Sequence, residues 1–318
     1  MRSSYGRIES LKTNIPIWFG LADIGTRRDR RESFLAMDAY FDAGGRQFDT
    51  AHCYAAWLEN GEGVSERLFG EWIAERDVRK EIIIATKGGH VGFGHYPRPE
   101  RYLDPALVRR DFDQSLERMR VDRVEVYFYH RDHRGESIEN LAGFMSSLLA
   151  ERLIDHAGIS NWTAPRAKAM AKALPKVKFW QNQWSLGRPT WEPTEHEGTT
   201  RYHLPEDLVV AEECGYVVMP YSSTANGFYG SNGTSGSRFD SPENRIRLER
   251  VNLVSEKTGF TRNQVALMFM LSQPIPPVEP IIGTLDPERI IELLSVSFQR
   301  LSQETLDYLD LKTDTWLS

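Results

Sequence analysis

The feature of this sequence that most constrains its fold is an alternation of short apolar runs with longer segments of helical period, repeated about eight times along the chain. The apolar run at 81–87 precedes a helical segment at 104–119, for example, and the run at 123–130 precedes another at 137–151. Strand-then-helix units of this kind make parallel strands, and eight of them close into a cylinder. Since no linker or change in composition divides the chain, the sequence predicts an α/β fold, a (β/α)8 TIM barrel formed by a single domain over residues 1–318.

The boundaries of these units can be estimated from the sequence. Strands are expected at 15–21, 46–50, 81–87, 123–130, 153–160, 176–183, 216–222 and 278–284. Helices are expected at 30–44, 64–77, 104–119, 137–151, 163–174, 204–214, 243–259, 263–273 and 286–295. Asp104 is the expected N-cap of its helix, with Pro105 at the first helical position. Residues 7–14 are expected to form a hairpin at the bottom of the barrel, and 303–318 a terminal helix and tail.

Composition and charge exclude several classes of protein. The chain is 40% hydrophobic and 26% charged, as soluble globular proteins are. Its net charge of −6 argues against nucleic-acid binding, which needs a surplus of Lys and Arg, and a solvated helix start explains the basic cluster at 27–31. Two cysteines, Cys53 and Cys214, are too few for a disulfide framework or a Cys-rich metal site. Since no signal segment or membrane-spanning stretch is present, the expected location is the cytoplasm, with no membrane partner.

Polar residues gather where the predicted strands end. Active sites of such barrels lie at the carboxyl ends of the strands, so side chains at these ends share one mouth. The residues concerned are Asp49, Lys87, His130, Ser160, Asn161, Gln181, Tyr221 and Ser222. Any one of them could be a helix cap or a solvated side chain, but their coincidence at one mouth indicates an active site.

Asp49, Tyr54, Lys87 and His130 together predict a proton transfer at a substrate oxygen. A free tyrosine has a pKa near ~10, and an ammonium ~4 Å away favours the phenolate by about 4 kcal/mol at an effective dielectric constant of ~20, or about three pKa units. Desolvation opposes this effect, so we expect a smaller net lowering of the pKa of Tyr54, enough to make it an effective acid. Asp49 would hold Lys87 charged and oriented, and His130 would position a carbonyl oxygen without a metal ion.

Seven phrases resemble the aldo-keto reductase superfamily, in this order: FDTAHCY, ATKGG, VYFYHRD, AGISNW, WQNQWS, MPYSS and PIIGT. The resemblance extends from about Ile17 to Asp310, and the SNW and QWSL variants are most similar to bacterial-type reductases that are usually assigned no certain substrate. It implies hydride transfer from NADPH to an aldehyde or ketone, or the reverse from an alcohol such as a sugar or polyol. It also implies that Tyr54 is the proton donor, that Lys87 and Asp49 tune the pKa of Tyr54, and that His130 orients the substrate.

The resemblance further implies where the cofactor binds. The residues expected to contact the nicotinamide and its ribose are Gly20, Leu21, Asp49, Ser160, Asn161, Gln181 and Tyr221. Ser222 would begin the stretch along the pyrophosphate. The residues expected at the adenosine end are Gly283, Thr284, Arg289 and Glu292.

Departures from the family pattern fall mainly at the adenosine end. Relatives often carry Arg or Lys around position 285, near the 2′-phosphate, where this chain has Leu285 followed by Asp286. A carboxylate there would repel a phosphate and could accept ribose hydroxyls, although Arg289 can still make a charge-assisted phosphate contact. Leu293 stands where an adenine-contacting Asn is common. NADP(H) is therefore the expected cofactor, with NAD(H) as an alternative.

Two segments near the mouth have more than one interpretation. Asn226 stands at the usual Arg after the seventh strand, and the Gly/Ser-rich stretch at 230–245 is either a mobile flap over the cofactor or a disordered loop. Trp57 is the best candidate for a substrate-binding aromatic residue, because it follows Tyr54 closely in a loop. Cys53 is expected to be a small pocket filler, with a redox-sensitive thiol as the alternative.

Three function hypotheses follow. The first is a carbonyl reductase, the second a nicotinamide-binding regulatory subunit of the same fold with little turnover, and the third a lyase on a barrel that uses no nicotinamide. His130 and His133 could suggest metal ligation, but the HxH pair of metal-dependent barrel hydrolases is missing from the first strand, so no metal is expected. The sequence names neither the small-molecule carbonyl or alcohol substrate nor the oligomeric state.

Overall fold

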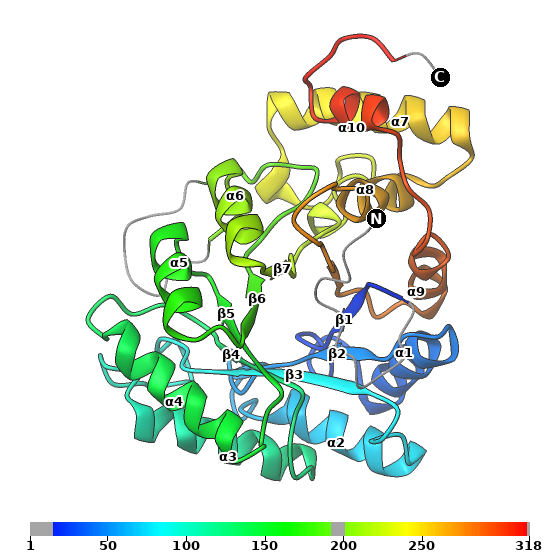
Figure 1. Cartoon of the computed structure of the whole chain (residues 1–318). Coiled ribbons are helices and arrows are strands. Elements are labelled where there is room, and N and C mark those ends of the chain that lie inside the picture. Colours follow the sequence, from blue (N-terminus) through cyan, green and yellow to red (C-terminus); the bar gives the residue numbers. More distant parts are fainter. Residues whose placement is uncertain (1–14, 192–200, 317–318) are drawn as a thin grey trace.

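The computed structural model describes residues 15–191 and 201–316, which form eight parallel strands surrounded by helices (Figure 1). The strands are β1 (Trp18–Gly20), β2 (Gln47–Asp49), β3 (Ile83–Gly88), β4 (Val126–Tyr129), β5 (His156–Ser160), β6 (Val177–Gln181), β7 (Val217–Val218) and β8 (Ile281–Ile282). The main helices are α1 (Arg30–Asp42), α2 (Val64–Arg76), α3 (Pro105–Met119), α4 (Ile138–Ala150), α5 (Ala164–Ala173), α6 (Pro205–Cys214), α7 (Pro242–Thr258), α8 (Arg262–Leu271), α9 (Pro287–Leu294) and α10 (Gln303–Leu309). The predicted hairpin at 7–14 lies outside the described residues.

The sheet closes into a barrel. Its strands follow the order β7-β6-β5-β4-β3-β2-β1-β8, and every pair is parallel. The two edge strands, β7 and β8, are joined by backbone hydrogen bonds along the segment that leads into β8. The Val218 N–H donates to the Pro277 carbonyl at 2.9 Å, and the Glu279 N–H donates to the Val218 carbonyl at 2.9 Å. The Ile281 N–H donates to the Pro220 carbonyl, also at 2.9 Å. The predicted (β/α)8 fold is confirmed.

Local sequence signals set the helix boundaries. The Asp104 carboxylate accepts a hydrogen bond from the Ala106 N–H at 3.0 Å, and Pro105 begins α3, as predicted from the sequence. Asp29 caps α1 in the same way and forms a capping box with Glu32. The predicted terminal helix is present as α10. Within the part of the chain that the structure describes, no helix combines the length and apolarity that a bilayer crossing requires.

The inside of the barrel explains how the strands position a site. Side chains of alternate residues point inward along each strand. The inward residues that form a buried apolar cluster are Trp18, Ile83, Ala85, Val126, Phe128, Phe179, Val217, Met219 and Ile281. Two residues further along the same strands, the inward positions are taken by Gly20, Lys87, His130, Gln181, Tyr221 and Gly283. The apolar core therefore gives way to polar groups and glycines at the carboxyl mouth of the barrel.

Candidate active site

A buried lysine organises the mouth. The Lys87 ammonium donates three hydrogen bonds: to Asp49 Oδ2 at 2.7 Å, to the Thr50 carbonyl at 2.7 Å and to the Tyr54 hydroxyl at 3.0 Å. Gln181 donates to the other carboxylate oxygen of Asp49 at 3.1 Å. All three protons of the ammonium thus have acceptors, and its position relative to the phenol is fixed.

Lys87 and Asp49 form an ion pair that is almost completely withdrawn from solvent, with side-chain exposures of 0% and 2%. Burial lowers the pKa of Lys87, and the carboxylate of Asp49 opposes that shift. Burial also raises the pKa of Asp49, and Lys87 opposes that shift in turn. Each charge therefore depends on the other, and a change at either residue leaves an unpaired buried group.

The prediction that the pKa of Tyr54 is lowered is wrong for the protein without ligand. Burial raises the pKa of this phenol well above its usual value, and the Asp49 carboxylate raises it further. The pKa of Tyr54 rises because desolvation of the phenol and the charge of Asp49 together outweigh the attraction of Lys87. At neutral pH, Tyr54 is consequently a neutral phenol that retains its proton.

His130 follows β4 and lies beside Tyr54, with the two ring centroids 5.9 Å apart and nearly perpendicular. Burial lowers the pKa of His130 well below its usual value, and the nearby His90 lowers it further, so the imidazole is neutral. Its Nδ1 atom is 3.4 Å from the Cys53 sulfur. Burial raises the pKa of the Cys53 thiol to about 12, which agrees with a pocket filler rather than a reactive thiolate.

Three of the residues predicted to contact the nicotinamide and its ribose are linked to one another. Asn161 donates to the Ser160 hydroxyl at 2.9 Å, and the Tyr221 hydroxyl donates to the Asn161 amide oxygen at 2.7 Å. Since Gln181 donates a hydrogen bond to Asp49, the structure brings these residues and the Lys87–Asp49–Tyr54 cluster together at one mouth.

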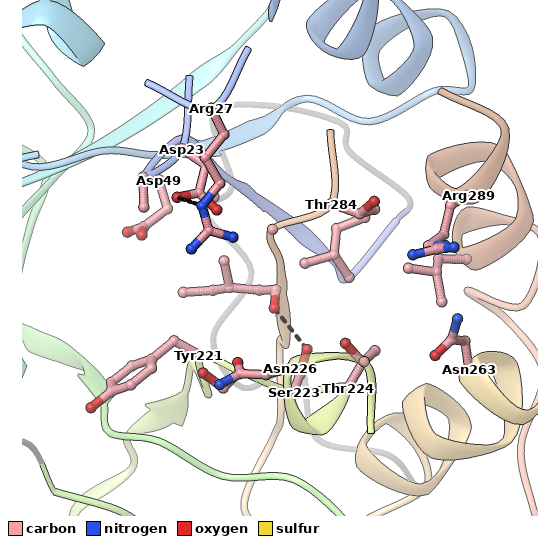
Figure 2. Close-up of a pocket in the computed structure, with 18 of the residues that line it drawn as sticks. Asp23, Arg27, Asp49, Tyr221, Ser223, Thr224, Asn226, Asn263, Thr284 and Arg289 are labelled. Atoms are coloured by element: carbon pink, nitrogen blue, oxygen red, sulfur yellow. Dashed lines mark hydrogen bonds and ion pairs between the residues drawn. The ribbon is translucent and has the colours of Figure 1, made fainter. Parts of the chain in front are cut away.

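A cavity of about 560 Å³ extends away from Tyr54, and its size lies within the range of ligand pockets, about 300–1,000 Å³. Figure 2 shows Asp49 and Tyr221 at one end of it and Arg289 and Asn263 at the other. The predicted residues that line it are Gly20, Asp49, Tyr54, Tyr221, Ser222, Gly283, Thr284 and Arg289. An elongated chamber with reactive groups at one end and a cation at the other fits the shape and charge of a dinucleotide.

Sequence reasoning missed Asn263, which is the second residue of α8 and lines the far end of the cavity with Arg289 and Leu293. Its amide oxygen is buried and has no hydrogen-bond partner among the described residues. An unsatisfied buried acceptor costs free energy, so it indicates a donor supplied by a ligand. The sequence pattern does not single out Asn263, because it resembles any polar residue at the start of a helix.

Arg27 was also missed. The basic cluster at 27–31 was expected to be a solvated helix start. Arg30 does begin α1 and is exposed. Arg27 instead lies in the loop after β1, lines the cavity and pairs with Asp23 at 3.5 Å. Both residues appear beside Asp49 in Figure 2.

Some predicted residues do not line the cavity. The side chain of Leu21 is fully buried in the core, and Glu292 accepts a hydrogen bond from the Thr261 hydroxyl. Asp286 is not among the residues that line the cavity, and its carboxylate caps α9 by accepting the Glu288 N–H at 3.1 Å. Its effect on a phosphate stays a prediction. Trp57 is 42% exposed and lies outside the cavity lining, so its contact with a substrate stays a prediction.

The segment after β7 contributes to the cavity wall. It begins with the 3-10 helix η1 (Ala225–Gly227), and Thr224, Asn226 and Gly227 line the cavity. Further along, Phe228, Tyr229 and Phe239 are fully buried. The segment is therefore packed onto the core through these three aromatic side chains, of which Phe239 lies in the stretch at 230–245. Whether this stretch is mobile stays a prediction.

Comparison with known proteins decides the family. The model of the Aldo/keto reductase family matches residues 16–314, nearly the whole chain. The chain belongs to the aldo/keto reductase family. Its barrel is therefore that of an aldo/keto reductase, and the resemblance found in the sequence is confirmed.

Among the relatives of this aldo/keto reductase is YrpG of Bacillus subtilis, an uncharacterized oxidoreductase that is 28% identical and aligns over 92% of this chain and 90% of its own. An NADP(+) aryl-alcohol dehydrogenase of Phanerodontia chrysosporium is 23% identical and aligns over 93% of this chain and 81% of its own. A crystal structure of an aldo/keto reductase from Klebsiella pneumoniae, in complex with NADP and acetate, superposes with a TM-score of 0.69 and 22% identity. It covers 93% of this chain and 90% of that one, and it shows the same fold.

Proposed function

We propose that this protein is an NADP(H)-dependent carbonyl reductase that converts an aldehyde or ketone to an alcohol, or the reverse on a sugar or polyol. The observation that carries the proposal is the Lys87 ammonium, which contacts Asp49 and the Tyr54 hydroxyl at once, at the end of the cavity. When bound, the nicotinamide would supply the hydride, and the residues of this chain supply the proton and the geometry.

The proton comes from the Tyr54 hydroxyl, which is neutral and retains its proton at neutral pH. As negative charge develops on the substrate oxygen, Tyr54 donates this proton, and the Lys87 N–H donor 3.0 Å away stabilises the phenolate that remains. Asp49 and the Thr50 carbonyl keep the ammonium in place, so no reorganisation accompanies the transfer. Neutral His130 has an N–H that can orient the carbonyl oxygen.

The cavity supports a dinucleotide cofactor. Tyr221 offers a ring face near the reactive end, Arg289 offers a guanidinium to a phosphate, and the orphaned Asn263 amide oxygen accepts a donor such as an amino group of a base. Asp286 is engaged as a helix cap and does not line the cavity. Arg289 therefore favours NADP(H) in our proposal, with NAD(H) as the alternative.

The test is turnover of reduced nicotinamide, followed by its absorbance, with a panel of aldehydes, ketones and sugars. Replacing Tyr54 with Phe removes the proton donor and should lower kcat by about 10²- to 10⁴-fold, which is the range of general acid catalysis, without weakening cofactor binding. Tyr308→Phe on α10 is the matched control and should leave kcat unchanged.

Unchanged turnover in Tyr54→Phe would exclude the assigned acid. Cofactor binding without turnover on any carbonyl or alcohol would favour the regulatory subunit instead.

A further inference from the structure

We propose that Cys53, His90 and His130 form a binding site for Zn²⁺ at the substrate side of the barrel mouth, and that the bound ion inhibits the enzyme. Nothing in the comparisons assigns a metal to these residues. The binding part stands on geometry alone, whereas the inhibition rests on the proposed function, because His130 is the residue that orients the substrate oxygen.

The three side chains converge from three different loops. Cys53 follows β2, His90 follows β3 and His130 follows β4, and their ligand atoms all lie within 4.8 Å of one another. The Cys53 sulfur and His130 Nδ1 are 3.4 Å apart. A tetrahedral zinc ion with bonds of about 2.3 Å to sulfur and about 2.0 Å to nitrogen holds two such atoms about 3.5 Å apart. The Cys53 sulfur and His130 Nδ1 therefore already lie at the separation that a tetrahedral zinc ion requires.

The imidazole of His90 has one nitrogen with a lone pair available for coordination. Its Nδ1 atom is 2.7 Å from the Val91 carbonyl, which can only accept, so Nδ1 carries the proton and Nε2 is bare. Zinc-binding histidines commonly donate their second nitrogen to a backbone carbonyl in this way, which fixes the tautomer and the ring orientation.

The protonation states of the ligands suit a metal ion. Burial lowers the pKa of His90 to about 3, so both imidazoles are neutral, the form that coordinates metals. The Cys53 thiol keeps its proton in the free protein. On binding, the thiol S–H bond breaks, a Zn–S bond forms and one proton leaves to solvent, so the thiolate offsets one charge of the ion.

The site is held in place before a metal arrives. The Gly89 N–H donates to Asp111 at 3.0 Å, and the His130 N–H donates to the Gly88 carbonyl at 2.8 Å. The His90 ring packs against Phe93 with centroids 5.0 Å apart. Because Cys53 and His130 are buried while His90 is partly exposed, the ion would reach the site past His90.

None of the three ligands lines the cavity that extends toward Arg289. A metal at this site therefore engages His130 without occupying the cofactor cavity. Zn²⁺ should raise KM for the carbonyl substrate as a competitive inhibitor does and leave cofactor affinity unchanged.

Co²⁺ tests the site directly, because cobalt bound to a thiolate has a charge-transfer absorption that cobalt bound only to nitrogen and oxygen lacks. We expect one Co²⁺ per chain with this absorption, and its loss on adding Zn²⁺. The absorption should disappear in Cys53→Ala and persist in Cys214→Ser, the matched control, since Cys214 is the other free cysteine. His90→Ala should weaken Zn²⁺ binding at least tenfold in calorimetry.

An absorption that persists in Cys53→Ala, or Zn²⁺ affinity that is equal in wild type and His90→Ala, would overturn the site. These readouts do not depend on turnover, so they hold even if the proposed reaction is wrong. For inhibition, the Zn²⁺ concentration that halves the rate, relative to each variant's own uninhibited rate, should rise at least tenfold in His90→Ala. Equal sensitivity of the two proteins would show that the ion acts elsewhere.

Discussion

The end of the cavity beside Lys87 is enclosed and its polar groups are paired, whereas the end beside Arg289 is exposed and contains a buried amide oxygen without a partner among the described residues. The first end is a buried ion pair that supports both the fold and the chemistry, so its residues cannot vary independently. The second end does not stabilise the barrel in this way. The two departures that the sequence resemblance predicts, Leu285 and Leu293, lie toward the second end, although Leu293 is itself buried in the core.

The most severe test of this contrast is Lys87→Met, which leaves the Asp49 carboxylate buried and unpaired. Loss of one partner of a buried ion pair costs about 3–5 kcal/mol, so urea unfolding should show a decrease of that size in the free energy of unfolding. The double variant Lys87→Met/Asp49→Leu should recover much of the lost free energy of unfolding.

Lys168→Met is the matched control, because Lys168 is paired with Glu213 at 2.7 Å on the surface, where removal should have little effect. Equal destabilisation by the two Lys→Met changes would mean that the end beside Lys87 is not held by its ion pair.

A smaller effect is expected at the far end. Asn263→Ala removes the orphaned acceptor, so it should weaken dinucleotide binding by about 3- to 10-fold, the value of one neutral hydrogen bond of about 0.5–1.5 kcal/mol. Affinity for reduced nicotinamide mononucleotide, which lacks the adenosine, should not change. Asn252→Ala on α7 is the control, and a loss of mononucleotide affinity in Asn263→Ala would place this amide near the nicotinamide instead.

Asp286→Ala distinguishes between two roles of Asp286, as a helix cap and as a contact of the cofactor. Since the carboxylate caps α9, its removal should lower the free energy of unfolding by about 1 kcal/mol and leave the ratio of NADPH to NADH affinity unchanged. Calorimetric titration with each cofactor measures the ratio. A tenfold shift toward NADPH would show that Asp286 faces the phosphate after all.

The smallest expected change is with pH. The pKa of His130 is depressed, so this group gains a proton only below its usual range near ~6.5, and the raised pKa of Tyr54 means that it loses its proton only above ~10. With saturating cofactor, kcat/KM for reduction should therefore be flat from about pH 6.5 to about pH 9. A decline centred near pH 6.5 that vanishes in His130→Gln would show that this imidazole titrates in the working range.

Much of the fold and part of the site follow from local patterns. The alternation of apolar runs and helical segments placed the strands, and the polar residues at strand ends located Asp49, Lys87 and His130. The sign of the Tyr54 pKa shift could not be predicted, because it depends on the loops that bury the ring. Asn263 was missed because only the closed barrel brings α8 to the cavity.

Asp286 differs from these cases because its signal was present in the sequence. Asp286-Pro287 repeats the Asp104-Pro105 pattern that correctly predicted the start of α3. The same dipeptide therefore marks the start of α9 at Pro287, with Asp286 as its N-cap.

The backbone hydrogen bonds that join β7 to the segment leading into β8 have a consequence for the stability of the protein in the cell. Residues 221–224 on one side of the join and residues 281–284 on the other both line the cavity. A dinucleotide bound there touches both edges of the sheet, and at one hundred times its dissociation constant it would add about 2.7 kcal/mol to the free energy of unfolding. On the proposed function, the bound dinucleotide therefore also stabilises the closed barrel. Proteolysis of this chain should accelerate when the cell's pool of this dinucleotide is depleted.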